Sequence, residues 1–245
     1  MVAILHIRIM AINTATRMNL IPPSSMSALR LWQLISPALP VGAYAYSQGL
    51  EYAIDEQWVN NKEEVEQWIK GQVKHNLAHM DIPVLKRIYI AWQNNDFDQV
   101  KEWSEFLIAA RESSELVAED LHLGRALATL LHELEVPNAE QYKLSDNACY
   151  AVLLSLAAVH WSISIDEIAQ GYLWSWCENQ VAAAIKLVPL GQTDGQKILI
   201  SVADVIPEAV QSGLKLEDEE IGMLAPAVGI SSALHETQYS RLFRS

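Results

Sequence analysis

Residues 148–161 read A-C-Y-A-V-L-L-S-L-A-A-V-H-W, and this run is apolar on almost every side of a helix. Much of Ile165–Val188 is apolar in the same way, and Ser164 and Glu167 are spaced as a capping box at its start. A helix that is apolar all round is buried among other helices. The first run is too short to span a bilayer, and polar residues interrupt the second run, so neither run is a membrane-spanning segment. We therefore expect two central helices of a bundle.

Amphipathic segments flank these two runs on both sides in the sequence. Apolar residues recur in them at helical spacing, which predicts an outer layer of helices around the central pair. Asn61, with Glu64 three residues later, fits the start of one of them. The predicted outer helices cover residues 28–35, 47–54, 61–80, 81–92, 97–107, 116–134, 193–211 and 226–235. The expected fold class is all-α: a single-domain bundle of roughly nine or ten helices with two central apolar helices.

The ends of the chain have a different composition from the middle. Residues 1–26 combine a short apolar run with a Pro/Ser/Thr/Asn-rich stretch, so we expect a flexible leader, with a later methionine as a possible start. Residues 27–236 form the expected helical domain. Residues 237–245 form a tail that carries two arginines together with Leu242 and Phe243. An apolar and basic end on an acidic protein is typical of a segment that orders when it binds a partner.

Charge and composition exclude several classes of function. The formal net charge of the 245-residue chain is −13, which argues against nucleic-acid binding because phosphate neutralisation needs clustered Lys and Arg. With 51% hydrophobic residues the chain has enough apolar material for a sizeable core. Its two cysteines, Cys149 and Cys177, lie in apolar helical contexts and are expected to be buried thiols in a reducing compartment. We expect a cytoplasmic protein with no membrane contact.

One stretch breaks the helical pattern three times in seven residues. Residues 36–51 read S-P-A-L-P-V-G-A-Y-A-Y-S-Q-G-L-E, and Pro37 and Pro40 each fix φ and remove a backbone donor. Gly42 permits a positive φ that a residue with a side chain resists. Tyr44 and Tyr46 have few apolar neighbours to cover them, and amphipathic aromatics of this kind are enriched at interfaces. We expect a rigid loop that packs against other proteins.

No motif in the sequence predicts catalysis or a bound metal. His75 and His79 stand four residues apart with Asp81 beyond them, a spacing that can bind a metal, but they fall off the apolar stripe and no third ligand is implied. Glu119 and His122 match one Glu-x-x-His unit of di-metal helical bundles, which require two such units. We expect both pairs to lie on the surface. The nucleophile elbow, the P-loop and a Cys pair at ligand spacing are missing from the sequence.

The loop and the tail carry a resemblance to a known family. The sequence from Leu34 to Glu51, and the closing run H-E-T-Q-Y-S-R-L-F-R-S from His235 to Ser245, resemble the opening and closing motifs of the urease accessory protein UreF family. The likeness covers about residues 28–245. The chain departs from the family pattern at Tyr44-Ala45, where Phe-Ser is frequent.

The resemblance implies an all-α, dimeric, non-enzymatic chaperone with no catalytic residues, no metal ligands of its own and no tightly bound cofactor. UreF-like proteins join a UreD/UreH-type scaffold and the GTPase UreG to deliver nickel into apo-urease, and the complex handles the nickel. By position, the residues expected to contact partners are Pro37, Pro40, Gly42, Tyr44, Tyr46, Gln48, Gly49, Glu51, His235, Glu236, Tyr239, Arg241, Leu242, Phe243 and Arg244.

Two other functions remain open from the residues alone. One is a metal-dependent helical-bundle enzyme that uses Glu119, His122, His75 and His79. The other is a GTPase-activating protein that inserts an arginine into the partner's active site, with Arg241, Arg244 or Arg125 as the candidates.

Overall fold

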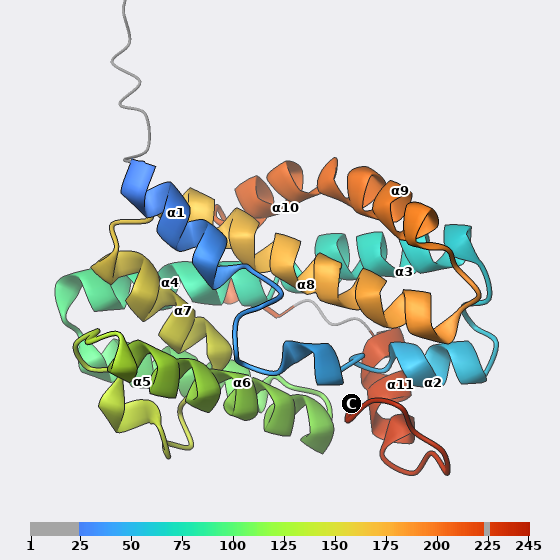
Figure 1. The fold of residues 1–245 in the computed structure, drawn as a ribbon. Coiled ribbons are helices and arrows are strands. Elements are labelled where there is room, and N and C mark those ends of the chain that lie inside the picture. The colour runs from blue at the N-terminus through green and yellow to red at the C-terminus, as the bar shows by residue number, and fades with distance from the viewer. Residues whose placement is uncertain (1–24, 223–225) are drawn as a thin grey trace, which may run out of the picture.

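The computed structural model describes residues 25–222 and 226–245, and this part of the chain folds into helices without any strand (Figure 1). The predicted all-α class is therefore confirmed. The expected leader lies outside the described residues except for Ser25 and Met26, which begin the first helix. The α-helices are α1 (Ser25–Leu34), α2 (Leu50–Asp55), α3 (Lys62–Gln72), α4 (Asp81–Asn94), α5 (Phe97–Ala109), α6 (Ser114–Glu133), α7 (Tyr150–His160), α8 (Ile165–Leu187), α9 (Gln192–Ala203), α10 (Ile206–Gly213) and α11 (Pro226–His235).

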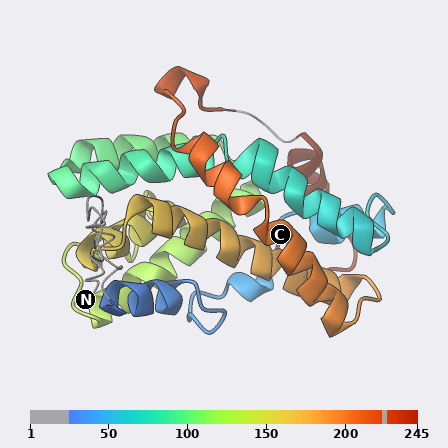
Figure 2. The same cartoon turned by 90° about the horizontal axis from the view of Figure 1, so that it is seen from above.

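The two apolar runs form α7 and α8, and both are central as predicted. Helix α8 packs against α1, α2, α3, α4, α7, α9 and α10, while α7 packs against α4, α5 and α6. The two views of the bundle show these outer helices on different sides of the central pair (Figures 1 and 2). In α7 every residue from Ala151 to Ala158 is buried. Burial on all sides explains why these segments lack a polar face.

Local capping signals set several helix starts. Ser164 Oγ accepts a hydrogen bond from Glu167 N at 3.3 Å, and the Glu167 carboxylate accepts one from Ser164 N at 2.9 Å, so the predicted capping box is confirmed. Asn61 accepts a hydrogen bond from Glu64 N at 3.0 Å and caps α3. The reciprocal bond from Glu64 is made to Asn60 N instead of Asn61 N. The sequence therefore indicated this helix start with the correct cap.

The helix predicted over residues 61–80 is not continuous, and that prediction is wrong at its second half. Helix α3 ends at Gln72, and a π turn, η2, covers Val73–Leu77. Ala78 N donates to Val73 O at 3.1 Å, a bond across five residues that widens the turn. The widened turn keeps Val73, Leu77 and Ala78 all buried. Apolar spacing alone cannot distinguish this arrangement from a regular helix.

Helix α11 brings the end of the chain against its beginning. It packs on α2 and α6, and close approach to α2 depends on Gly49. A Cβ atom at Gly49 would lie 2.3 Å from Ser231 Oγ, a distance at which something must shift. Residues about 180 positions apart therefore become neighbours. Among the described helices, none is long and apolar enough to cross a membrane.

Candidate functional site

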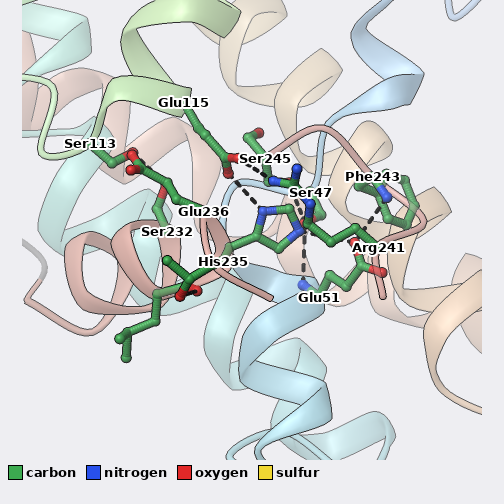
Figure 3. Close-up of polar contacts among 12 residues, drawn as sticks. Ser47, Glu51, Ser113, Glu115, Ser232, His235, Glu236, Arg241, Phe243 and Ser245 are labelled. Carbon is green, nitrogen blue, oxygen red and sulfur yellow. Dashed lines mark hydrogen bonds and ion pairs between the residues drawn. The ribbon is translucent and has the colours of Figure 1, made fainter. Parts of the chain in front are cut away.

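The loop and the tail predicted from the sequence meet in one cluster of buried hydrogen bonds. We call it the loop–tail cluster, and it comprises Ser47, Gln48, Glu51, Glu115, Glu119, His235, Arg241 and residues 242–245. Figure 3 shows most of these side chains converging from α2, α6, α11 and the tail. The two segments that the sequence analysis selected separately are thus two halves of one structure.

Glu51 holds the backbone of the tail. Its side chain is buried, and its two carboxylate oxygens accept hydrogen bonds from Leu242 N at 2.6 Å and Phe243 N at 2.9 Å (Figure 3). Glu51 stands in the first turn of α2, directly after the Gly49–Leu50 step where the left-handed backbone of Gly49 starts the helix. Hydrogen bonds to a charged acceptor are stronger than neutral ones, so this carboxylate is a strong anchor for the tail.

His235 links the two acidic side chains that flank it. Its Nε2 lies 3.1 Å from Glu51 Oε2, its Nδ1 lies 2.7 Å from Glu115 Oε2, and the residue is fully buried. Arg241 from the tail donates to the other oxygen of Glu115. The cluster therefore combines cationic and anionic groups that lie far apart in the sequence.

Glu119 receives the last residue of the tail, and the prediction that it lies on the surface is wrong. It is only 3% exposed, its Oε1 accepts from Gln48 Nε2 at 2.8 Å, and its Oε2 accepts from Ser245 Oγ at 2.7 Å. Burial raises the pKa of Glu119 to about 7, although the hydrogen bonds from Gln48 and Ser245 act in the opposite direction. Trp176 Nε1 donates to Gln48 Oε1 at 2.7 Å and fixes that amide. Packing of the loop and tail over α6, which the sequence does not reveal, explains the burial.

The loop itself has the special backbone that its glycine predicted. Gly42 has a φ of +83°, in the left-handed region that favours glycine. Asn179 Nδ2 of α8 donates to Ala43 O at 2.9 Å and to Tyr46 O at 3.3 Å. Tyr44 is exposed as expected, but Tyr46 is 5% exposed and the prediction that it lacks cover is wrong. Tyr46 packs near His122, and burial raises the pKa of its phenol.

The other predicted contact residues divide into exposed and buried sets. Pro37, Pro40, Glu236, Tyr239, Arg241, Leu242 and Arg244 are exposed, and Gln48 is partly buried. Phe243 is buried in the hydrophobic core, with the Lys186 ammonium 5.2 Å from its ring centre. The tail was expected to need a partner in order to become ordered. In this structure its last residues instead pack on their own chain.

Sequence reasoning missed a second buried network behind the loop. Arg111 donates to Asp81 Oδ1 at 2.8 Å and to Asp120 Oδ2 at 2.9 Å, and Tyr172 Oη donates to Asp81 at 2.7 Å. Asp81 begins α4, Arg111 precedes α6 and Asp120 lies within α6, and no sequence pattern links these three charged residues. A cavity of about 370 Å³ borders this network, and its walls include apolar loop residues as well as Arg111, Glu119 and Asp120. These charged groups already have protein partners.

The candidate metal ligands are not brought together. His75 is exposed on the π turn and His79 is half-buried just after it, while His122 is exposed on α6 as predicted. Within residues 25–222 and 226–245, the structure holds no group of three or more His, Cys, Asp or Glu that could bind a metal ion. Of the candidate inserted arginines, Arg241 is paired with Glu115 and Arg125 with Asp146.

Fold and site together define an all-helical protein whose distinguishing feature is a loop and a tail joined by buried carboxylates. A family model described as UreF matches residues 59–203. The chain is 53% identical over 216 residues to a urease accessory protein UreF of Alkalilimnicola ehrlichii, covering 88% of this chain and 95% of the relative. It is 48% identical over 217 residues to that of Teredinibacter turnerae, covering 89% and 98%. The chain belongs to the UreF family of urease accessory proteins.

Proposed function

We propose that this chain is a chaperone in nickel-dependent urease maturation. It bridges a UreD/UreH-type scaffold and the GTPase UreG during nickel insertion into apo-urease, and it acts in the cytoplasm as a homodimer. The observation that carries the proposal is family membership over most of the chain. The nickel is handled by the assembled complex, and this chain contributes binding surfaces in place of a catalytic centre or a tightly bound cofactor.

The loop–tail cluster supports a role in assembly. Its buried hydrogen bonds fix the backbone of the tail, while Tyr239 is fully exposed and Leu242 is 64% exposed. The Glu51 carboxylate holds the backbone of Leu242 in place, and a large apolar side chain held at the surface in this way binds a partner with a small loss of conformational entropy. Tyr44 on the loop is 71% exposed as well. We assign the scaffold contact to Tyr239 and Leu242.

The test is a double substitution, Tyr239→Ala with Leu242→Ala, in the full chain. Both side chains are exposed, so the thermal unfolding transition is expected to stay unchanged while co-purification with the scaffold partner is lost. Urease activation in a strain lacking the wild-type protein is expected to fall with it. Removing the whole tail is a poorer test because it also uncovers Glu51 and Glu119.

Leu144→Ala with Ile200→Ala is the matched control, because these side chains are 91% and 70% exposed elsewhere on the molecule. This control variant is expected to retain both scaffold capture and urease activation. Scaffold capture at the wild-type level by the Tyr239/Leu242 variant would show that the assignment is wrong.

A further inference from the structure

The last four residues are bound in the manner of an extended peptide ligand. Leu242 and Arg244 are exposed while Phe243 and Ser245 are buried, the alternation of an extended backbone. Arg244 N donates to Ala45 O at 2.8 Å, and Ser47 donates to Ser245 O from its backbone N at 2.8 Å and from its Oγ at 2.6 Å. Main-chain hydrogen bonds with pockets for alternate side chains are one established mode of peptide recognition.

The residues that bind this segment are also held by groups outside it. We call residues 45–51 together with Glu119 the receptor segment. Asn179 fixes the carbonyl of Tyr46 and that of Ala43 just before the segment, and Trp176 fixes Gln48. Gly49 packs on α11, and His235 contacts Glu51. None of these contacts comes from residues 242–245, so the receptor segment keeps this support when the tail leaves.

The link between α11 and the bound segment is loosely attached. Thr237 N and Gln238 N bond only to the preceding helical turn, Gln238 Nε2 donates one long hydrogen bond to Asp55 Oδ2 at 3.4 Å, and Tyr239 is fully exposed. Arg241 is the next residue with a side-chain contact, to Glu115. Residues 242–245 can therefore leave the receptor segment without unwinding α11.

We propose that the receptor segment is a peptide-binding site and that residues 242–245 are its exchangeable occupant. The ligand class is an extended peptide with an aromatic residue and, two positions later, a serine. Phe243 enters the hydrophobic core beneath Lys186, and Ser245 donates to Glu119. Leu242 is exposed, so its position is open to variation, whereas the exposed Arg244 side chain also forms a hydrogen bond with Tyr46 of the receptor segment. The same site accepts this sequence from a separate molecule when the chain's own tail is displaced.

Exchange at this site would control the surface that partners contact. The reason is that binding of the tail to the receptor segment sets the positions of Tyr239 and Leu242. That consequence rests on the proposed function. The peptide site itself does not, and it can be tested with this chain alone.

The test measures binding of a fluorescent synthetic peptide with the sequence of residues 237–245 to two full-length proteins. In the wild type, the attached tail competes at an effective concentration on the order of millimolar. Arg244→Pro removes the amide that bonds Ala45 O and the side-chain hydrogen bond to Tyr46, and it makes no cavity in the core because the replaced side chain is exposed. The peptide is expected to bind the variant at least about tenfold more tightly than the wild type.

Two controls test whether the peptide binding is specific. A peptide with alanine in place of the residue equivalent to Phe243 is expected to lose binding, because it cannot fill the buried position. The double variant Arg244→Pro with Glu51→Gln is expected to bind the wild-type peptide several-fold more weakly, since the carboxylate no longer accepts two tail amides. Equal binding to wild type and variant, binding without the aromatic residue, or no binding up to millimolar peptide would each overturn the proposal.

Hydrogen exchange on the wild-type protein gives a second test that needs no variant. The amides of Leu242 and Phe243 are expected to exchange much faster than the central amides of α8, because tail release is a local opening. If those tail amides exchange only with global unfolding, the tail is a fixed part of the fold and the proposal fails. Neither experiment involves the scaffold. The peptide site is therefore tested independently of the proposed scaffold contact.

Discussion

The α7–α8 pair and the loop–tail cluster are both buried, but they are held together by opposite means. The central helices bury continuous apolar runs, and their neighbours only need to be apolar and of suitable shape. The loop–tail cluster buries carboxylates, a histidine and backbone amides, each of which needs a specific partner. The first region therefore stabilises the whole fold, whereas the second fixes one local arrangement and can open by itself.

The largest effect is expected in the central pair. Leu153 of α7 is completely buried, so Leu153→Ala removes apolar burial and leaves a cavity, at a cost of about 2–5 kcal/mol in the free energy of unfolding. Urea unfolding followed by circular dichroism measures the loss. Ile200→Ala, at a position 70% exposed on α9, is the control and is expected to change stability by less than about 0.5 kcal/mol. Comparable costs at the two positions would contradict the central placement of α7.

A smaller and pH-dependent effect is expected in the loop–tail cluster. Burial raises the pKa of Glu119 from 4.5 to about 7, so the folded chain binds more protons than the unfolded chain between these values. The stability from this group is complete below pH 4.5 and is lost as the pH rises through about 7. Since one pKa unit corresponds to about 1.4 kcal/mol, the loss is on the order of 3–4 kcal/mol. Glu119→Gln is expected to remove this decrease in the free energy of unfolding with rising pH.

The measurement compares urea unfolding of wild type and Glu119→Gln from pH 5 to pH 8. A glutamine can accept from Gln48 and donate to Ser245 Oγ, so the geometry at position 119 is preserved. The two stability curves are expected to diverge as the pH rises, with the variant the more stable at pH 8. Parallel curves would show that Glu119 is no more costly to ionise in the fold than in the unfolded chain.

The contrast between the two regions also explains what the sequence could predict. Apolar runs and capping boxes are local signals, so α7, α8, α11 and the start at Ser164 were found. The choice of the loop and the tail came from unusual composition and from the family resemblance. The contact between the loop and the tail could not be predicted from the sequence, because Glu51 and Leu242 are 191 residues apart and no periodicity links them. The burial of Tyr46, Phe243 and Glu119 follows from that contact, which is why these three were misplaced.

The smallest effect is expected at Gly42, where backbone conformation can be separated from packing. A Cβ atom there would meet only His122 Nε2 at 3.6 Å, an ordinary contact, so the cost of Gly42→Ala comes from its φ of +83° alone. A left-handed conformation costs an L-residue about 1–2 kcal/mol, and that is the expected loss of stability. Gly71→Ala is the matched control, because Gly71 lies inside α3 with no atom within 4 Å of its Cβ position. Alanine favours a helix by about 1 kcal/mol over glycine, so the control is expected to gain stability. A loss of stability for Gly42→Ala together with a gain for Gly71→Ala would show that the left-handed backbone of Gly42 keeps the loop rigid. Losses of equal size at both positions would show that Gly42 has no special conformational role.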